Sequence, residues 1–250
     1  MDPRTYLFVP GNRPERFAKA LASGADAVVL DLEDAVAAAA KAEARDAIAQ
    51  WARQASEADR ARVVVRINDA QSSAFADDLR LLRDSRIAGV MLPKAESAEH
   101  IQAVRAVVPE ARVLALLESA RGIVAAHEVA GADGVVRLVF GTLDYALDLD
   151  LCIDNGPDAL SHAASVLALA SRVADLAWSR RYGFGAKLCI HPRQVAPIHA
   201  ALAPSDQALV WAQRVLAAEA ASPGAAQLDG RMIDRPVVLQ AQRTLQRAGA

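Results

Sequence analysis

The chain has 250 residues, of which 53% are hydrophobic and 4% aromatic, and this length is typical of one α/β barrel domain. A net charge of −2 gives no electrostatic case for a nucleic-acid or membrane partner. Two cysteines without metal-type spacing, no signal-peptide pattern and no run near the roughly 20 apolar residues of a membrane span lead us to expect a soluble, cytoplasmic protein.

Strand-like and helix-like segments alternate along the chain. Short apolar runs that end in turn residues or acids predict buried parallel strands at 6–9, 27–31, 62–67, 90–92, 113–117, 135–140 and 187–190. Helical patterns separate them at 14–23, 41–58, 75–83, 96–107, 122–129 and 158–181. Strands joined by helices form right-handed βαβ units, and this chain length favours a closed barrel over a doubly wound sheet. The count is seven strands, whereas a complete (β/α)8 barrel has eight.

The C-terminal part has a different pattern. Ser205 is the expected N-cap of a helix that runs to about residue 221, and the Ser-Pro-Gly stretch at 222–224 is the expected linker. We therefore predict a barrel domain at 1–222 and, at 223–250, a linker with a short helical lid whose helix begins near Pro236.

Acidic residues follow three of the predicted strands. Glu118 comes directly after the fifth strand and Asp144 shortly after the sixth, while Asp31 ends the second. The carboxyl ends of barrel strands converge on the active-site face, and Mg²⁺ binds one or two carboxylates together with water and substrate oxygens. We predict that Glu118 and Asp144 are metal ligands; the alternative is that each acid caps the helix after it.

Asp31, Glu33 and Asp34 crowd the end of the second strand and repel one another unless cations neutralise them. They could hold metal-bound waters or orient Arg66, which is costly in its apolar strand unless it is paired. The guanidinium fork suits a carboxylate, an enolate or a thioester oxygen. Helix capping remains the alternative for the acids, and a structural ion pair remains the alternative for Arg66.

Basic residues gather after the first strand. Arg13, Arg16 and Lys19 form a small cluster that suits a phosphate-bearing substrate, or else a solvated helix face. Lys94 follows the fourth strand, and the many nearby carboxylates favour a salt-bridged lysine over a Schiff-base lysine.

Short motifs occur in a characteristic order along nearly the whole chain: LFVPGNRPERF at 7–17, LDLEDAV at 30–36, VRIN at 65–68, LPK at 92–94, ESARG at 118–122, FG at 140–141, KLCIHP at 187–192 and DGRMID at 229–234. Together they resemble the citrate lyase β-subunit-like branch of the HpcH/HpaI aldolase superfamily. The resemblance implies a TIM-barrel fold, a homo-oligomer (a trimer or hexamer) and an acyl-CoA substrate. The implied reaction is Mg²⁺-dependent C–C cleavage or formation in 3-hydroxyacyl-CoA esters such as citryl-, malyl-, methylmalyl- and citramalyl-CoA. Some family members hydrolyse the thioester instead.

The resemblance also implies site residues: metal ligands Glu118 and Asp144, catalytic residues Arg66, Asp34 and Asp234, and CoA contacts Phe8, Arg13 and Lys19. Arg66 would hold the substrate's keto acid and stabilise enolate charge. Asp234, in the tail, would act as an acid/base in the site of a neighbouring subunit.

One departure from the family pattern concerns the region of the seventh strand. Family members carry a strand and a further helix there, whereas in this chain residues 174–177 pass almost directly into 179–185, which resemble the end of the helix before the eighth strand. About one βα unit is therefore missing, so the barrel is incomplete, filled by other residues, or swapped between subunits. Two alternatives to an acyl-CoA lyase are an aldolase acting on free hydroxy-keto acids and a non-catalytic barrel subunit.

Overall fold

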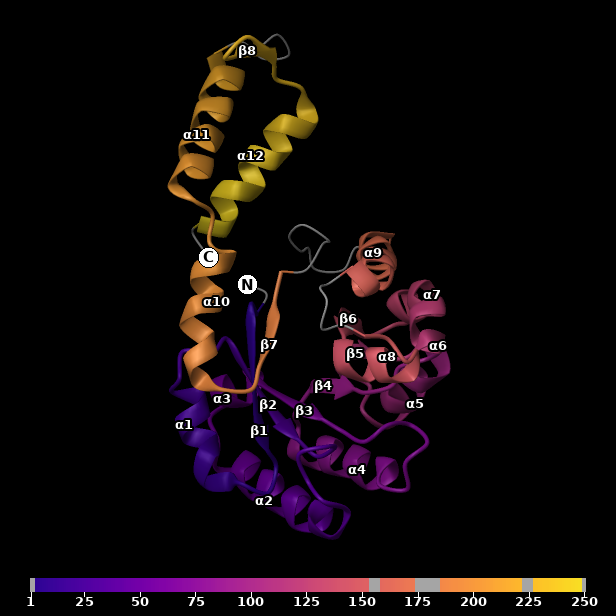
Figure 1. The fold of residues 1–250 in the computed structure, drawn as a ribbon. Helices are drawn as coiled ribbons and strands as arrows, with labels where there is room; N and C mark the ends of the chain where they lie inside the picture. The colour runs from indigo at the N-terminus through magenta and orange to yellow at the C-terminus, as the bar shows by residue number, and fades with distance from the viewer. Residues whose placement is uncertain (1–2, 153–157, 174–184, 222–226, 249–250) are drawn as a thin grey trace. The chain divides into compact units, whose positions relative to one another are not determined.

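Seven parallel strands form the central sheet of the computed structural model, which describes residues 3–152, 158–173, 185–221 and 227–248 (Figure 1). The strands are β1 (Thr5–Pro10), β2 (Ala27–Asp31), β3 (Val63–Arg66), β4 (Gly89–Leu92), β5 (Arg112–Leu117), β6 (Val135–Phe140) and β7 (Lys187–Cys189). They pair in the order β6-β5-β4-β3-β2-β1-β7, and every pairing is parallel. All seven predicted strands are present.

Both faces of the sheet are buried, which is why its strands are almost continuously apolar. Along β2, Val28 and Leu30 join the large cluster that packs beneath the helices, while Ala27 and Val29 join a second cluster on the opposite face. That second cluster lines the inside of the curled sheet and is built from Tyr6, Ala27, Val29, Val64, Met91, Leu114, Leu116 and Val139. The predicted α/β fold of the TIM-barrel type is confirmed.

In the described residues the sheet has seven strands and does not close into a complete barrel. Within the described residues, β6 pairs only with β5, and β7 pairs only with β1. The two edge strands of the sheet therefore do not pair with each other. The sequence predicts that about one βα unit is missing near the seventh strand. Residues 174–184 of that region lie outside the described residues.

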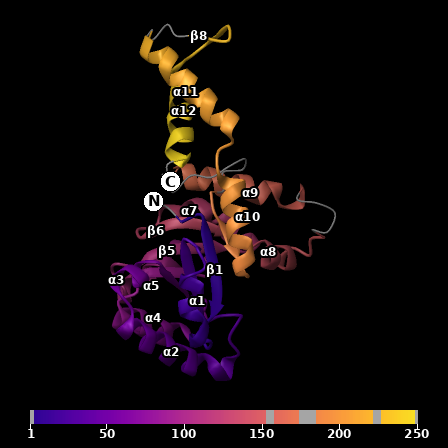
Figure 2. The same ribbon diagram turned by 90° about the vertical axis from the view of Figure 1, so that its left-hand side faces the viewer.

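Helices surround the sheet, and α2, α4 and α5 follow one another along its outer side (Figures 1 and 2). The helices of the barrel unit are α1 (Phe17–Leu21), α2 (Lys41–Gln54), α3 (Glu57–Ala61), α4 (Phe75–Ser85), α5 (Ala98–Val107), α6 (Ala120–Val124), α7 (Ala126–Gly131), α8 (Thr142–Asp148) and α9 (Asp158–Val173); α10 (Val195–Leu202) follows β7. Short 3-10 helices span Pro14–Arg16, Ala38–Ala40 and Pro192–Gln194. In the described part of the chain, no helix combines the length and apolarity needed to cross a membrane.

Two of the predicted single helices are wrong. Residues 41–58 form α2 and then the start of α3, because Ala55 takes an extended backbone and the Ser56 side chain accepts a hydrogen bond from the Asp59 amide (3.1 Å). This capping begins a new helix at Glu57. The predicted helix at 122–129 is likewise divided, into α6 and α7.

Residues His199–Ala250 form a second compact unit, distinct from Asp2–Ile198. Helices α11 (Asp206–Ala221) and α12 (Arg235–Ala248) pack side by side, and the short antiparallel pair β8 (Gln227–Leu228) and β9 (Arg231–Met232) lies between them in the chain (Figure 1). The Ser205 Oγ accepts a hydrogen bond from the Ala208 amide (3.2 Å), which confirms the predicted N-cap. Because α11 packs against α12, both helices belong to this second unit. The domain boundary that the sequence places at residue 222 stays a prediction.

Candidate active site

Glu118 lies directly after β5 and is buried, with 4% of its surface exposed. Its Oε1 accepts a hydrogen bond from the Lys94 amide (3.0 Å). Gly141 leaves room for the carboxylate, since a Cβ at this position would lie 2.5 Å from the Glu118 Cβ and 2.6 Å from its Oε2. Capping of α6 is done by Ser119, whose Oγ accepts from the Gly122 amide (3.1 Å). Glu118 is therefore free of the capping role considered from the sequence.

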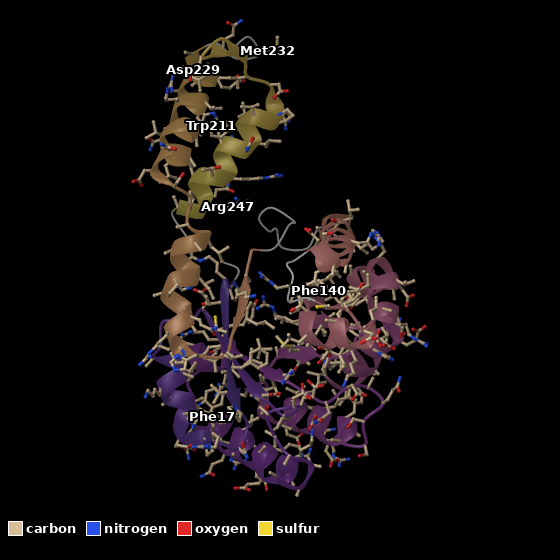
Figure 3. All side chains as sticks on the ribbon, in the orientation of Figure 1. Phe17, Phe140, Trp211, Asp229, Met232 and Arg247 are labelled. Atoms are coloured by element: carbon tan, nitrogen blue, oxygen red, sulfur yellow. The ribbon has the colours of Figure 1, made fainter. Side chains whose placement is uncertain are left out.

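Asp144 lies in the first turn of α8, which the sequence analysis does not predict. Phe140, labelled in Figure 3, is the last residue of β6. Its ring packs edge-on against Tyr145 with centroids 5.3 Å apart and so anchors this turn. Asp144 lies close enough to Glu118 for its negative charge to raise the pKa of the Glu118 carboxyl group. The structure thus brings together the two acids that the sequence proposes as metal ligands.

The electrostatic setting of Glu118 is unfavourable for a free carboxylate. Burial and the negative charges of Glu33 and Asp144 raise the pKa of Glu118 to about 8, against the opposing effect of the Lys94 amide. A divalent cation would relieve this repulsion.

Arg66 ends β3 and is enclosed by acids. Its Nε and Nη2 donate to Asp31 Oδ1 (2.7 Å) and Oδ2 (2.5 Å), and its Nη1 lies 2.8 Å from Glu33 Oε2 and 3.3 Å from Asp34 Oδ2. The guanidinium stacks 5.0 Å from the ring centroid of Phe8. Burial disfavours the charged form, but the hydrogen bonds and charges of the acids outweigh it and raise the pKa of Arg66 above its usual value.

Asp31 has two tasks. Besides holding Arg66, its Oδ1 accepts from the Glu33 amide (2.9 Å) and its Oδ2 from the Ala35 amide (3.1 Å). An aspartate that binds amides shortly after itself stabilises a turn. Asp31 therefore holds Arg66 as the sequence suggests, and it stabilises a turn instead of capping a helix.

Glu33 lies between Arg66 and Lys94. Its Oε2 is close to Arg66 Nη1 but lacks the alignment of a hydrogen bond, and Lys94 Nζ lies 3.7 Å from its Oε1. Burial raises the pKa of Glu33 to about 7, and Arg66 opposes this shift. Lys94 has a left-handed backbone (φ 47°), unusual for a residue with a side chain, and its amide is the donor to Glu118. The expected salt bridge of Lys94 is present.

The residues at this end of the sheet fit a divalent cation. Among the described residues, acids outnumber cations there: Asp31, Glu33, Asp34, Glu118 and Asp144 lie around Arg66 and Lys94. Within the described residues, no group of three or more acids, histidines or cysteines is arranged to hold a metal. Two carboxylates suit Mg²⁺, because this ion keeps several water or substrate ligands.

The remaining proposed site residues are Arg13, Lys19 and Asp234. Arg13 is exposed and pairs with Glu15 (2.6 Å), and Lys19 is exposed on α1. Asp234 belongs to the C-terminal unit, where its Oδ1 accepts from the Val237 amide (3.1 Å) at the start of α12.

The sequence analysis overlooks two buried polar residues next to the site, Asn68 and Asp78. A signal for Asp78 is readable in the sequence, because it occupies the apolar stripe of α4 with Phe75, Leu79 and Leu82. An acid at such a position indicates a buried partner.

A curled parallel sheet with acidic residues gathered at its carboxyl edge defines a protein of the α/β-barrel class. Residues 4–181 match the HpcH/HpaI aldolase/citrate lyase family, and the chain belongs to this family.

The chain is similar to several characterised or solved family members. It is 38% identical over 269 aligned positions to the citrate lyase subunit beta-like protein of Mycobacterium tuberculosis, covering 98% of this chain and 95% of that protein. It is 30% identical over 271 positions to a (3S)-malyl-CoA thioesterase of Cereibacter sphaeroides, covering 99% and 95%. The structure of M. tuberculosis CitE in complex with magnesium, acetoacetate and coenzyme A matches with a TM-score of 0.87 at 37% identity, over 99% of this chain and 98% of that one.

The alignment with the M. tuberculosis relative also bears on the missing unit. Its 269 positions exceed the 250 residues of this chain by 19, so at least 19 positions of the alignment have no counterpart here. This deficit agrees with a barrel that has lost about one βα unit.

Proposed function

We propose that this protein is a Mg²⁺-dependent carbon–carbon lyase acting on a 3-hydroxyacyl-CoA ester of the citryl-, malyl-, methylmalyl- or citramalyl-CoA type. The observation that carries the proposal is the buried Glu118, with the partly exposed Asp144 beside it, at the same edge of the sheet as the acid-bound Arg66. Support comes from the relative whose structure contains magnesium, acetoacetate and coenzyme A.

Glu118 and Asp144 would hold Mg²⁺, which when bound supplies Lewis-acid polarisation of substrate oxygens. In the cleavage direction, a base removes the proton of the substrate hydroxyl, the C–C bond breaks to give a keto acid and a thioester enolate, and the enolate carbon takes up a proton. Arg66 contributes fixed positive charge beside the developing negative charge. Because Asp31 and Phe8 already hold its guanidinium, little reorganisation is needed during the reaction.

The proposal extends to acid/base chemistry and assembly. We assign Asp234 as the acid/base that acts in the site of a neighbouring subunit, and this assignment requires a homo-oligomer. Asp34, which is exposed and lies 3.3 Å from Arg66, completes the proposed catalytic group. Size measurement in solution tests the oligomer directly, since a monomer at assay concentration would exclude a site shared between subunits.

Recognition of CoA is proposed for Phe8, Arg13 and Lys19. The two basic side chains are exposed after β1, and their charges suit the phosphates of CoA. We expect the double variant Arg13→Ala/Lys19→Ala to raise the KM for the CoA ester at least roughly tenfold, because charge-assisted hydrogen bonds contribute more than 1 kcal/mol each. Unchanged kinetics would favour an aldolase that acts on free hydroxy-keto acids.

Thioester hydrolysis is the second candidate function, favoured by the 30% identity to the (3S)-malyl-CoA thioesterase. Incubating the protein and Mg²⁺ with a panel of 3-hydroxyacyl-CoA esters separates the two reactions. A lyase releases a shorter acyl-CoA and a keto acid, whereas a thioesterase releases free CoA thiol.

Two variants of this experiment provide the control. Glu118→Gln should abolish product formation, whereas Glu110→Gln, the same change at an exposed position before β5, should not. Failure of the unmodified protein to release either product from any ester would refute the proposed function.

A further inference from the structure

The acidic loop after β2 is held in place by a buried polar network. Lys41, the first residue of α2, donates from Nζ to the main-chain oxygens of Leu32 (3.0 Å) and Glu33 (3.4 Å) and to Asn68 Oδ1. These contacts use all three ammonium hydrogens on uncharged oxygens. Among the described residues, no ion pair joins Lys41 to an acid.

Asn68 and Asp78 extend this network toward α4. Asn68 is buried, and its Nδ2 donates to the Leu32 oxygen (3.1 Å) and to Asp78 Oδ2 (2.6 Å). The main-chain amide of Asn68 also donates to Asp78 Oδ2 (2.8 Å). The fully buried Asp78 accepts a further hydrogen bond, at Oδ1, from Arg45 Nη1 (3.0 Å). The loops after β2 and β3 are thereby fastened to α2 and α4.

The network fixes the stretch of main chain from which Glu33 projects. The Leu32 amide donates a hydrogen bond to the main-chain oxygen of Arg66 (2.8 Å). The main-chain oxygen of Leu32 accepts hydrogen bonds from Lys41 Nζ and Asn68 Nδ2. From this anchored backbone the Glu33 carboxylate comes within 2.8 Å of Arg66 Nη1. A tetrahedral ammonium suits three converging oxygens, whereas the planar fork of an arginine does not.

We infer that Lys41 is a positioning residue for the site: by holding the main chain of Leu32 and Glu33, it places the Glu33 carboxylate against Arg66. Lys41 is outside the residues assigned to metal, CoA or acid/base chemistry, and it acts on the reaction only through Glu33 and Arg66. The kinetic consequence of this inference rests on the proposed lyase function, whereas its structural consequence does not.

The kinetic test uses three substitutions. Lys41→Met removes the ammonium and should lower kcat by about 30-fold while changing KM less than about threefold, in the range seen for residues that orient a site. Lys41→Arg keeps the charge but not the three-oxygen geometry, so it should fold yet fail to restore kcat. Lys187→Met, at an exposed residue of β7, is the matched control and should leave both constants unchanged.

Coupling to Glu33 distinguishes positioning from a general loss of structure. In a Glu33→Gln background, Lys41→Met should lower kcat by less than about threefold further, because the two residues act through one contact. Full additivity of the two substitutions, or full turnover in Lys41→Arg, would overturn the inference.

Amide hydrogen exchange tests the same inference without turnover. In Lys41→Met, the amides of Glu33 and Ala35, which donate to Asp31, should exchange faster, while those of Val29 and Val65 in β2 and β3 stay protected. If the unmodified protein acts on no CoA ester, the proposed function fails but this measurement still decides the role of Lys41. Unchanged exchange at residue 33, or equal loss of protection throughout the sheet, refutes it.

Discussion

Gly141 provides a quantitative test of how the chain positions Glu118. A Cβ in Gly141→Ala would lie 2.5 Å from the Glu118 Cβ and 2.6 Å from its Oε2. Carbon atoms in favourable contact are about 3.5–4.0 Å apart, so the overlap is on the order of 1 Å. Because the Glu118 Cβ is attached directly to the backbone at the end of β5, rotation of its side chain does not remove the clash. Overpacking of this kind costs about 1–3 kcal/mol.

We expect Gly141→Ala to lower the free energy of unfolding in urea by this amount, about 1–3 kcal/mol. Titration calorimetry should also show Mg²⁺ binding weakened by about 10–100-fold, because a displaced carboxylate loses its Lys94 and Asp144 partners. Gly131→Ala is the matched control, since its added Cβ would meet nothing within 4 Å and its backbone is not left-handed. Unaltered stability together with unaltered Mg²⁺ affinity in Gly141→Ala would refute the argument.

Three further predictions concern charge at the site. Arg66→Met leaves the buried Asp31 without its cation and Glu33 with Lys94 alone, and the free energy of unfolding should fall by about 3–5 kcal/mol in urea titrations. In metal-free protein, the raised pKa of Glu118 makes its contribution to stability complete below pH 4.5 and lost as the pH rises to about 8, so Glu118→Gln should flatten the decline of melting temperature over this range. Asp234→Asn should lower kcat far more than it changes KM, since asparagine caps α12 as well as aspartate does.

Each of these predictions has a control or a contradicting outcome. Arg83→Met removes an exposed ion pair with Asp84 and should cost less than about 1 kcal/mol, so equal losses at positions 66 and 83 would contradict the burial argument. Superimposable pH profiles for the unmodified protein and Glu118→Gln would show that this carboxyl group does not titrate as described. Equal changes in kcat and KM would remove Asp234 from the chemistry.

The strands and the paired acids are predictable from sequence because both depend on local pattern. A strand buried on both faces needs a continuous apolar run, and the parallel arrangement brings the acids after neighbouring strands to one edge. Glu118 and Asp144 meet for this reason, although the helix that carries Asp144 is not predicted.

The network around Lys41 depends on contacts that no local pattern contains. Its bond to Asn68 spans 27 positions of the chain and exists only because β2 and β3 are neighbours in the sheet. A lysine at the first position of α2 is an ordinary surface pattern when read alone. The division of residues 41–58 into two helices is not predicted for a different reason. Ser56 follows several residues that favour a helix, and it becomes an N-cap because the backbone turns at Ala55.

In the described part of the sheet, the two proposed metal ligands have unequal mechanical support. Glu118 follows β5, which is bonded on both sides, whereas Asp144 follows β6, which in the described part of the sheet is bonded on one side only. An ion shared by both acids would connect the outermost strand to the interior of the sheet by a second route. Peeling of β6 and release of the ion would then be one thermodynamic event, so that the ion concentration sets how firmly this edge of the protein is closed.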